Sequence, residues 1–316
     1  LILCYHGVAY EDEHLWDGSL YVPPGFLDER LRILHEMQCS ILPLDEAVER
    51  LYGGTLPERS VAITFDDGYD DFDGVAFPIL QRHRVPVTVY LPTLRCGTDY
   101  PIFQIACSYV LWKARGQRTV VPELGGTTLD LTTPSGRSDA LTALRKAGGG
   151  KRMLEKNELV RSVARRLGVD YDAIVERRLL RIMSPDQVTR LSAAGVDFQL
   201  HTHTHNAPRD RERFLQEIET NRARICQMTR TDARHFCYPG GGYAPEFGPW
   251  LTEARVVSAT TCDPGLVSRA PPPLLLPRLI DTCHMSVSEF RGWVSGTAEL
   301  ITPRRSYAQF ATECDD

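Results

Sequence analysis

Short apolar runs alternate along the chain with segments whose apolar residues have helical spacing. Seven runs are typical of buried strands, at residues 1–5, 61–65, 85–91, 196–200, 235–239, 256–260 and 274–280. Helical spacing covers residues 26–37 and 44–51, a segment that begins near 71, and residues 209–228 and 286–294. Strands that alternate with helices favour parallel pairing with right-handed crossovers. The pattern therefore predicts an α/β fold, and seven strands suggest an incomplete (β/α) barrel.

The alternation breaks between about residues 92 and 181, where a helix-like stretch, a stretch rich in glycine and threonine, and basic helices follow one another. It resumes at Ser184, because a serine N-cap, Pro185 at N1 and Gln187 at N3 predict a well-formed helix start. We therefore expect one domain over residues 1–316, with a helical insertion at about 92–181.

The composition is that of a globular protein with a sizeable core, since 42% of the 316 residues are hydrophobic and 24% are charged. No apolar run approaches the roughly 20 residues that cross a bilayer, so we expect no transmembrane segment. The formal net charge of −5 hides an excess of basic residues between 145 and 181. That stretch is either a solvated helix face or a surface for phosphate on a lipid-linked or nucleotide-linked substrate. We expect no nucleic-acid binding.

The nine cysteines are an odd number and include no CxxC pair. This pattern argues against a disulfide framework or a structural zinc knuckle, and it predicts a reducing, cytoplasmic location. The chain begins at Leu1 rather than Met, so an extracytoplasmic location stays open. Cys4, Cys226 and Cys237 lie among apolar residues, and we expect them in the core without a catalytic role.

Two adjacent carboxylates end the second apolar run. Residues 61–65 alternate apolar with small or hydroxyl side chains, and Asp66, Asp67 and Gly68 follow directly. Parallel α/β folds place their sites at the carboxyl ends of strands, where the connecting loops converge. We therefore take Asp66 and Asp67 as candidate site residues, and the alternative is an ordinary Asp-Gly turn.

Three of the nine histidines fall within five residues, at His201, His203 and His205. A neutral imidazole binds divalent metals through one ring nitrogen, so His201 and His205 together with Asp67 supply two nitrogens and one oxygen. A catalytic metal needs three protein ligands and an open position. The sequence therefore indicates a metal site, and the alternative is a polar loop of solvated histidines.

Hydrolysis at such a site needs a base and an acid. Asp66 can take the proton from a water molecule that the metal acidifies, and His6, at the end of the first run, can donate a proton to a departing amine. The alternative for His6 is a satisfied core histidine. Backbone N–H groups near Tyr238 or Gly240, beside a run of three glycines, can stabilise an oxyanion.

These motifs resemble those of the polysaccharide deacetylases of the NodB-homology type, carbohydrate esterase family 4. The sequence T-F-D-D-G is similar to the family's first motif, which implies that Asp66 is the base and Asp67 a metal ligand. The sequence H-T-H-T-H is similar to its second motif, which implies that His201 and His205 are ligands and that His203 is not. The resemblance also implies a distorted barrel of seven strands and Zn²⁺ as the metal, although iron, cobalt or nickel suits the same ligands.

The chain departs from the family pattern at two places. In the third motif, Cys237 and Gly240 stand where the family has an arginine that contacts the base and a tyrosine, which puts the tuning of Asp66 and the oxyanion donor in question. His284 lacks the spacing of the C-terminal Leu-x-His motif, whereas L-C-Y-H-G at residues 3–7 resembles a permuted branch whose acid histidine lies in an N-terminal strand. We therefore favour His6 over His284 as the acid.

The resemblance implies a metal-dependent hydrolase that removes the N-acetyl group from an N-acetylated amino sugar in a glycan, a glycolipid or a nucleotide-sugar precursor. Two alternatives stay open. One is an amidohydrolase of cyclic imides or ureides on the same fold, which would release no acetate. The other is a carbohydrate-binding protein with a relict metal site, which the missing arginine favours, although binding alone requires neither Asp66 nor His6.

Overall fold

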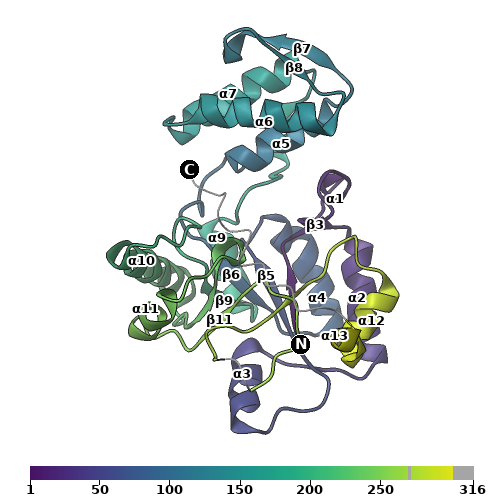
Figure 1. The fold of residues 1–316 in the computed structure, drawn as a ribbon, viewed down its shortest axis with the longest axis vertical. Helices are drawn as coiled ribbons and strands as arrows, with labels where there is room; N and C mark the ends of the chain where they lie inside the picture. The colour runs from purple at the N-terminus through teal and green to yellow at the C-terminus, as the bar shows by residue number, and fades with distance from the viewer. Residues whose placement is uncertain (270–271, 302–316) are drawn as a thin grey trace. The chain divides into compact units, whose positions relative to one another are not determined.

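The structure is a computed structural model, and it describes residues 1–269 and 272–301. The chain divides into two compact units, of which one comprises residues 1–96 and the chain from 183 onward, and the other comprises residues 97–182. Figure 1 shows the helices and strands of both units. Within the described ranges, no helix combines the length and the apolar character needed to cross a membrane.

A parallel sheet forms the centre of the first unit (Figure 1). Seven strands follow one another in the order β11-β10-β9-β6-β5-β1-β12. They are β1 (Ile2–Tyr5), β5 (Ser60–Asp66), β6 (Thr88–Leu91), β9 (Asp197–Leu200), β10 (His235–Cys237), β11 (Ser258–Thr260) and β12 (Leu279–Ile280). A short additional strand, β4 (Ser40–Ile41), pairs with β5. The α/β class and the seven parallel strands predicted from the sequence are confirmed.

One segment of the chain joins the two edges of this sheet. Its first half lies along β11, where the N–H of Leu276 donates to the Ala259 carbonyl over 2.8 Å. Its second half is β12, which pairs with β1 and sets Leu279 beside Leu3. The sheet therefore curls into a distorted barrel whose closing segment, residues 273–280, changes partner half-way. For this reason the run predicted at 274–280 is a regular strand only at its end.

Helices cover the outside of the sheet, with α2, α4 and α12 on one side and α9, α10 and α11 on another (Figure 1). The helices of this unit are α1 (Glu13–Trp16), α2 (Pro24–Glu36), α3 (Leu44–Gly53), α4 (Phe77–His83), α9 (Pro185–Ala193), α10 (Arg211–Thr229), α11 (Phe247–Glu253), α12 (Val287–Ser295) and α13 (Thr297–Ile301). Two short strands, β2 (Gly7–Val8) and β3 (Tyr21–Val22), pair beside them.

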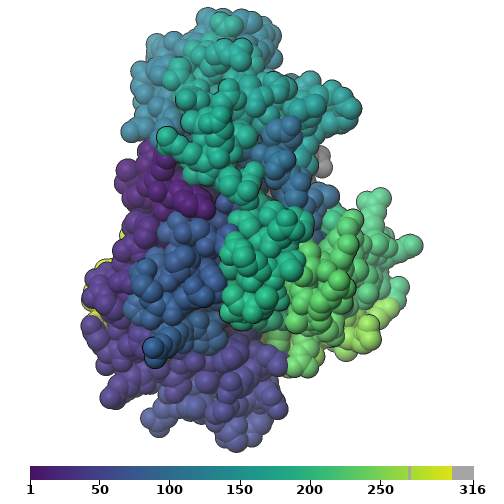
Figure 2. Space-filling model, turned by 180° about the vertical axis from the view of Figure 1, so that it is seen from behind, coloured from purple at the N-terminus to yellow at the C-terminus, as the bar shows by residue number. Residues whose placement is uncertain are grey.

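Two helix starts test the sequence pattern directly. The start of α9 is confirmed, since Ser184 and Gln187 form a reciprocal capping box. The helix predicted from about residue 71 begins instead as a π-helical turn, η1 (Phe72–Ala76), before α4 continues it. Figure 2 shows the surface around residues 70–85, in blue, against that of α9, and there Gln187 also donates to Asp73 over 2.9 Å.

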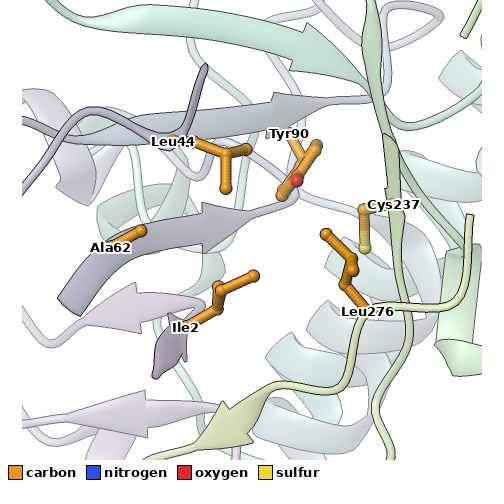
Figure 3. Packing of buried hydrophobic residues seen from close by; sticks show 6 residues of the cluster. All are labelled: Ile2, Leu44, Ala62, Tyr90, Cys237 and Leu276. Carbon is orange, nitrogen blue, oxygen red and sulfur yellow. The ribbon is translucent and has the colours of Figure 1, made fainter. Parts of the chain in front are cut away.

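Alternation along the strands decides which side chains fill the barrel. One buried cluster at its centre comprises Ile2, Leu44, Ala62, Tyr90, Cys237 and Leu276 (Figure 3). Two residues further along β1 and β5, on the same face, come Cys4 and Thr64, and two further come His6 and Asp66. The barrel interior is thus apolar near the amino ends of its strands and polar at their carboxyl ends.

The second unit, residues 97–182, is mainly helical. Its helices are α5 (Phe103–Lys113), α6 (Pro134–Gly148), α7 (Met153–Arg166) and α8 (Tyr171–Glu176). Between α5 and α6, β7 (Arg118–Val121) and β8 (Thr127–Asp130) form an antiparallel hairpin. The sequence does not predict this hairpin, because most of its side chains are exposed or half-buried and give no apolar alternation.

A buried polar network lies at the amino end of β10. The Nδ1 of buried His235 lies 2.8 Å from Ser258 Oγ, and its Nε2 lies 3.1 Å from a carboxylate oxygen of Asp45 in α3. Asp45 also accepts two hydrogen bonds from Arg234. Burial lowers the pKa of His235 below its ordinary value of 6.5, against the opposing charges of Asp197 and Asp45. His235 is therefore neutral in the folded protein near pH 7.

We expect the free energy of unfolding to decrease below pH 6.5, because the unfolded chain then binds a proton on His235 that the folded chain resists. The contribution of neutral His235 to the free energy of unfolding is complete above pH 6.5. It is lost as the pH falls from 6.5 toward the lower pKa that His235 has in the folded state. Urea unfolding of the wild type and of His235→Asn, from about pH 8 to about pH 5, measures it. An equally steep decline in the variant would show that other groups are responsible.

Candidate active site

The turn after β5 sends two adjacent carboxylates in different directions. Asp67 and Gly68 both have left-handed backbone angles, with φ of 66°. Glycine is required at the second position, because a Cβ on Gly68 would come within 2.5 Å of Leu91 Cδ1. As a result Asp66 is only 3% exposed inside the barrel, whereas Asp67 lies beside two histidines. Left-handed non-glycine residues such as Asp67 cluster at functional sites.

Asp67, His201 and His205 present their ligand atoms to one another. The Asp67 Oδ1 lies 3.2 Å from His205 Nε2 and 3.5 Å from His201 Nε2. One ligand atom from each of the three side chains falls within 4.8 Å of the other two. His205 is 45% exposed, so the group opens toward solvent. Two imidazole nitrogens and one carboxylate oxygen with an open side fit a divalent metal such as zinc.

The ring of His201 is fixed for such a role. Its Nδ1 lies 2.8 Å from the Cys237 carbonyl oxygen, which can only accept, so Nδ1 carries the proton and Nε2 turns its lone pair toward Asp67. Burial acts to raise the pKa of Asp67, but the nearby His205 and His201 lower it well below its usual range. The carboxylate is therefore ionised, as a metal ligand must be.

Arg278, in the closing segment, holds Asp66. Its Nη1 and Nη2 donate to the two carboxylate oxygens over 2.7 Å each, and neither side chain is more than 4% exposed. Burial acts to raise the pKa of Asp66, but the charge and hydrogen bonds of Arg278 lower it well below its usual range. Asp66 is therefore an ionised and oriented carboxylate beside the ligand group.

This pair corrects the interpretation of Cys237. From the sequence, the absence of an arginine at that position puts the tuning of Asp66 in question, whereas the structure supplies an arginine from position 278. Cys237 itself accepts a hydrogen bond from Arg278 over 3.0 Å. Arg278 is not among the residues assigned from the sequence. Its signal there is a lone charge inside the apolar run 274–280, which requires a buried partner.

His6 lies at the carboxyl end of β1, next to Asp66. Because β1 pairs with β5, a His6 ring nitrogen comes within 4.8 Å of an Asp66 carboxylate oxygen. Gly7 follows as the first residue of β2, where a Cβ would collide with the ring of Tyr21. His284, the other candidate for the acid, is exposed, and its N–H donates to Thr282 over 3.4 Å.

Two candidate oxyanion donors follow β10. The N–H of Tyr238 is already used in the sheet, since it donates to the Thr260 carbonyl over 3.2 Å, which corrects the expectation for that residue. Gly240 is exposed, with φ of 61°, and lies in the first turn of η3 (Pro239–Gly241). The Gly241 N–H closes this turn by donating to the Tyr238 carbonyl over 2.9 Å, so the Gly240 N–H is not used for that purpose. The geometry therefore favours Gly240 over Tyr238.

A buried asparagine fixes the loop that carries the histidines. Asn221 of α10 accepts a hydrogen bond from the His201 N–H over 2.9 Å. Its Nδ2 donates to the Leu91 carbonyl over 2.9 Å and to the Thr93 hydroxyl over 3.0 Å. That hydroxyl lies 2.9 Å from His203 Nδ1, so His203 has a structural partner away from the ligand group. These bonds join the carboxyl ends of β6 and β9 to α10.

The expectation for the cysteines needs correction. Cys226 is exposed on α10. Cys4 and Cys237 are buried as expected, but their surroundings are polar, since their Sγ atoms lie 3.6 Å and 3.4 Å from Asp66 Oδ2. Both thiols therefore border the candidate base.

One protein-family model covers the candidate ligands. A model described as polysaccharide deacetylase matches residues 53–104 and 167–256, which include Asp66, Asp67, His201 and His205. Over these two stretches the chain resembles the polysaccharide deacetylase family. The matched stretches stop short of His6 at one end and of Arg278 at the other, so these two residues rest on the structure alone.

Similar proteins share parts of this chain. The putative polysaccharide deacetylase YxkH of Bacillus subtilis (strain 168) is 32% identical over 91 residues, which span 28% of this chain and 30% of that relative. The Streptococcus pyogenes deacetylase PplD, solved in complex with acetate, covers 93% of this chain and 96% of its own, with a TM-score of 0.61 and 18% identity. IcaB from Ammonifex degensii covers the same shares with a TM-score of 0.59 and 14% identity. At these identities, the two solved structures show a shared fold.

We expect Arg278→Met to lower the free energy of unfolding by about 3–5 kcal/mol, because it leaves the Asp66 charge buried without a partner. The double variant Asp66→Asn/Arg278→Met removes both charges and should recover a large part of this loss. Urea unfolding of the two single variants and the double variant at neutral pH measures the coupling. Additive losses would contradict the pairing.

We expect Asn221→Ala to weaken metal binding by roughly 10- to 100-fold, because the His201 backbone loses its buried acceptor. Isothermal titration of the metal-free protein with zinc measures the affinity. Thr220→Ala, at the preceding residue of α10, is the matched control, since the Thr220 hydroxyl accepts a hydrogen bond from Gln216 of the same helix. An affinity unchanged in Asn221→Ala, with the fold intact, would show that the network does not position the ligands.

Proposed function

We propose that the protein is a metal-dependent hydrolase that removes the acetyl group from an N-acetylated amino sugar. The observation that carries this proposal is the position of Asp66. It is an ionised carboxylate held by Arg278, directly beside a separate ligand group of Asp67, His201 and His205. A base next to a metal site is an arrangement that can hydrolyse an unactivated amide.

Each side chain has a distinct task in this proposal. A divalent metal on Asp67, His201 and His205, with zinc as our first choice, supplies Lewis acidity at the amide carbonyl. Asp66 accepts a proton from the attacking water, and Arg278 keeps its two oxygens oriented while this happens. His6 donates a proton to the departing nitrogen, because it approaches Asp66 from the neighbouring strand.

Three features support a deacetylase over the alternatives. The family match names polysaccharide deacetylases, and one solved relative of the same fold holds acetate, the product expected here. Arg278 removes the reason for regarding the chain as a binding protein with a relict site, since the base has its arginine. We propose Gly240 as the oxyanion donor, because it is exposed in the turn after β10 and its N–H does not close that turn.

The second unit enters the proposal as an insertion in one deacetylase domain. Its excess of basic residues suits a phosphate group on a lipid-linked or nucleotide-linked substrate, and this contact stays a prediction. The cytoplasmic location also stays a prediction.

Acetate release tests the function. We expect the wild type, supplied with one equivalent of Zn²⁺, Co²⁺ or Ni²⁺, to release acetate from oligomers of N-acetylglucosamine. Asp66→Asn should keep its metal and lose about 10²- to 10⁴-fold in rate, because the base is removed while the three metal ligands stay in place. His201→Ala should lose both metal and activity. Elemental analysis and an enzymatic acetate assay measure the two quantities.

Cyclic imides and ureides are the control substrates. Ring opening of these compounds without acetate release from any N-acetylated sugar would contradict the proposal. Full activity of Asp66→Asn would contradict the role of the base.

A further inference from the structure

Cys4 is an unusual neighbour for a catalytic base. Its side chain shares the inner face of β1 with Ile2 and His6, and it is fully buried. Its Sγ lies 3.6 Å from Asp66 Oδ2, in the polar part of the barrel. A buried cysteine that serves only for packing behaves as a small apolar side chain and needs no charged neighbour. A thiol beside a carboxylate and an imidazole is instead the donor chemistry of a metal site.

The side chains of Cys4, His6 and Asp66 form a second ligand group. One ligand atom from each lies within 4.8 Å of the other two. This group shares no residue with Asp67, His201 and His205. We propose that Cys4, His6 and Asp66 bind a second, thiophilic divalent cation such as Zn²⁺ or Cd²⁺ when it is present in excess.

Cys237, Asp66 and His201 form a competing ligand group. In that group the imidazole of His201 is not available to bind a cation. The Nδ1 of His201 bonds to the Cys237 carbonyl, and its Nε2 faces Asp67. His6, in contrast, is half-buried, so its side of the group is open to solvent. The group with Cys4 therefore has three usable donors and an entry path.

Charge makes this second site the weaker of the two. When the cation binds, the Cys4 thiol releases its proton to solvent and a sulfur–metal bond forms, without any oxidation or reduction. The thiolate and the Asp66 carboxylate together balance a divalent cation. The guanidinium of Arg278, which shares the Asp66 oxygens, adds one uncompensated positive charge. Zinc should therefore fill the first site before it reaches the second.

Occupation of the second site has a consequence that rests on the proposed function. The same cation would engage both Asp66 and His6, and so remove the base and the acid together. Excess zinc should then inhibit acetate release, although one equivalent activates it.

Cobalt titration of the metal-free protein tests the site without any substrate, because only thiolate ligation gives Co²⁺ a charge-transfer absorption in the near ultraviolet. We expect the first equivalent to add none of this absorption and further Co²⁺ to add it. Cys4→Ser and Cys4→Ala should lose the band, and His6→Gln should require at least tenfold more Co²⁺ to reach it. Cys226→Ser, an exposed thiol on α10, is the matched control and should keep the band.

The site would be overturned by the absence of thiolate absorption in the wild type at excess Co²⁺, or by a band that survives in both Cys4 variants. Loss of the band in Cys237→Ser alone would assign it to the competing group and also contradict the proposal. A failure of the proposed function looks different, since acetate release would then be absent while the cobalt band still depended on Cys4.

Discussion

The ion pair between Asp66 and Arg278 is the interaction on which the site depends. Two opposite charges lie inside the barrel with almost no exposure, so each would be strongly unfavourable there without the other. Arg278 lies in the segment that joins β11 to β1, where regular strand pairing is short. The pair therefore links the closing segment of the barrel to β5, the strand that delivers both carboxylates.

This constraint separates the tasks of two neighbouring aspartates. Because Arg278 binds both of its carboxylate oxygens, Asp66 stays inside the barrel as a fixed negative charge. The left-handed turn at Asp67 and Gly68 directs the next carboxylate to the histidines instead. A base and a metal ligand thus come from consecutive residues without competing for the same partner. The left-handed backbone conformation of Asp67, which is unfavourable for a residue other than glycine, makes this separation possible.

Much of this arrangement could be predicted from the sequence, because its signals are local. The spacing of apolar residues along the chain predicted the α/β class and the seven strands. The spacing of the histidines indicated His201 and His205 as candidate metal ligands. The residues that support the site escaped prediction because their partners are distant in the chain. Arg278 reaches Asp66 across 212 positions, and only barrel closure brings them together. Asn221 occupies a polar position on the apolar face of α10, between Ile218 and Ile225, and its role depends on two strand ends.

The most direct test is an anomalous difference map at the zinc edge, from crystals grown with one equivalent of zinc per chain. The account predicts a single peak within bonding distance of Asp67, His201 Nε2 and His205 Nε2, with Asp66 still paired to Arg278. A first peak on Asp66, with Arg278 displaced, or a zinc ion bound only elsewhere on the chain would contradict it.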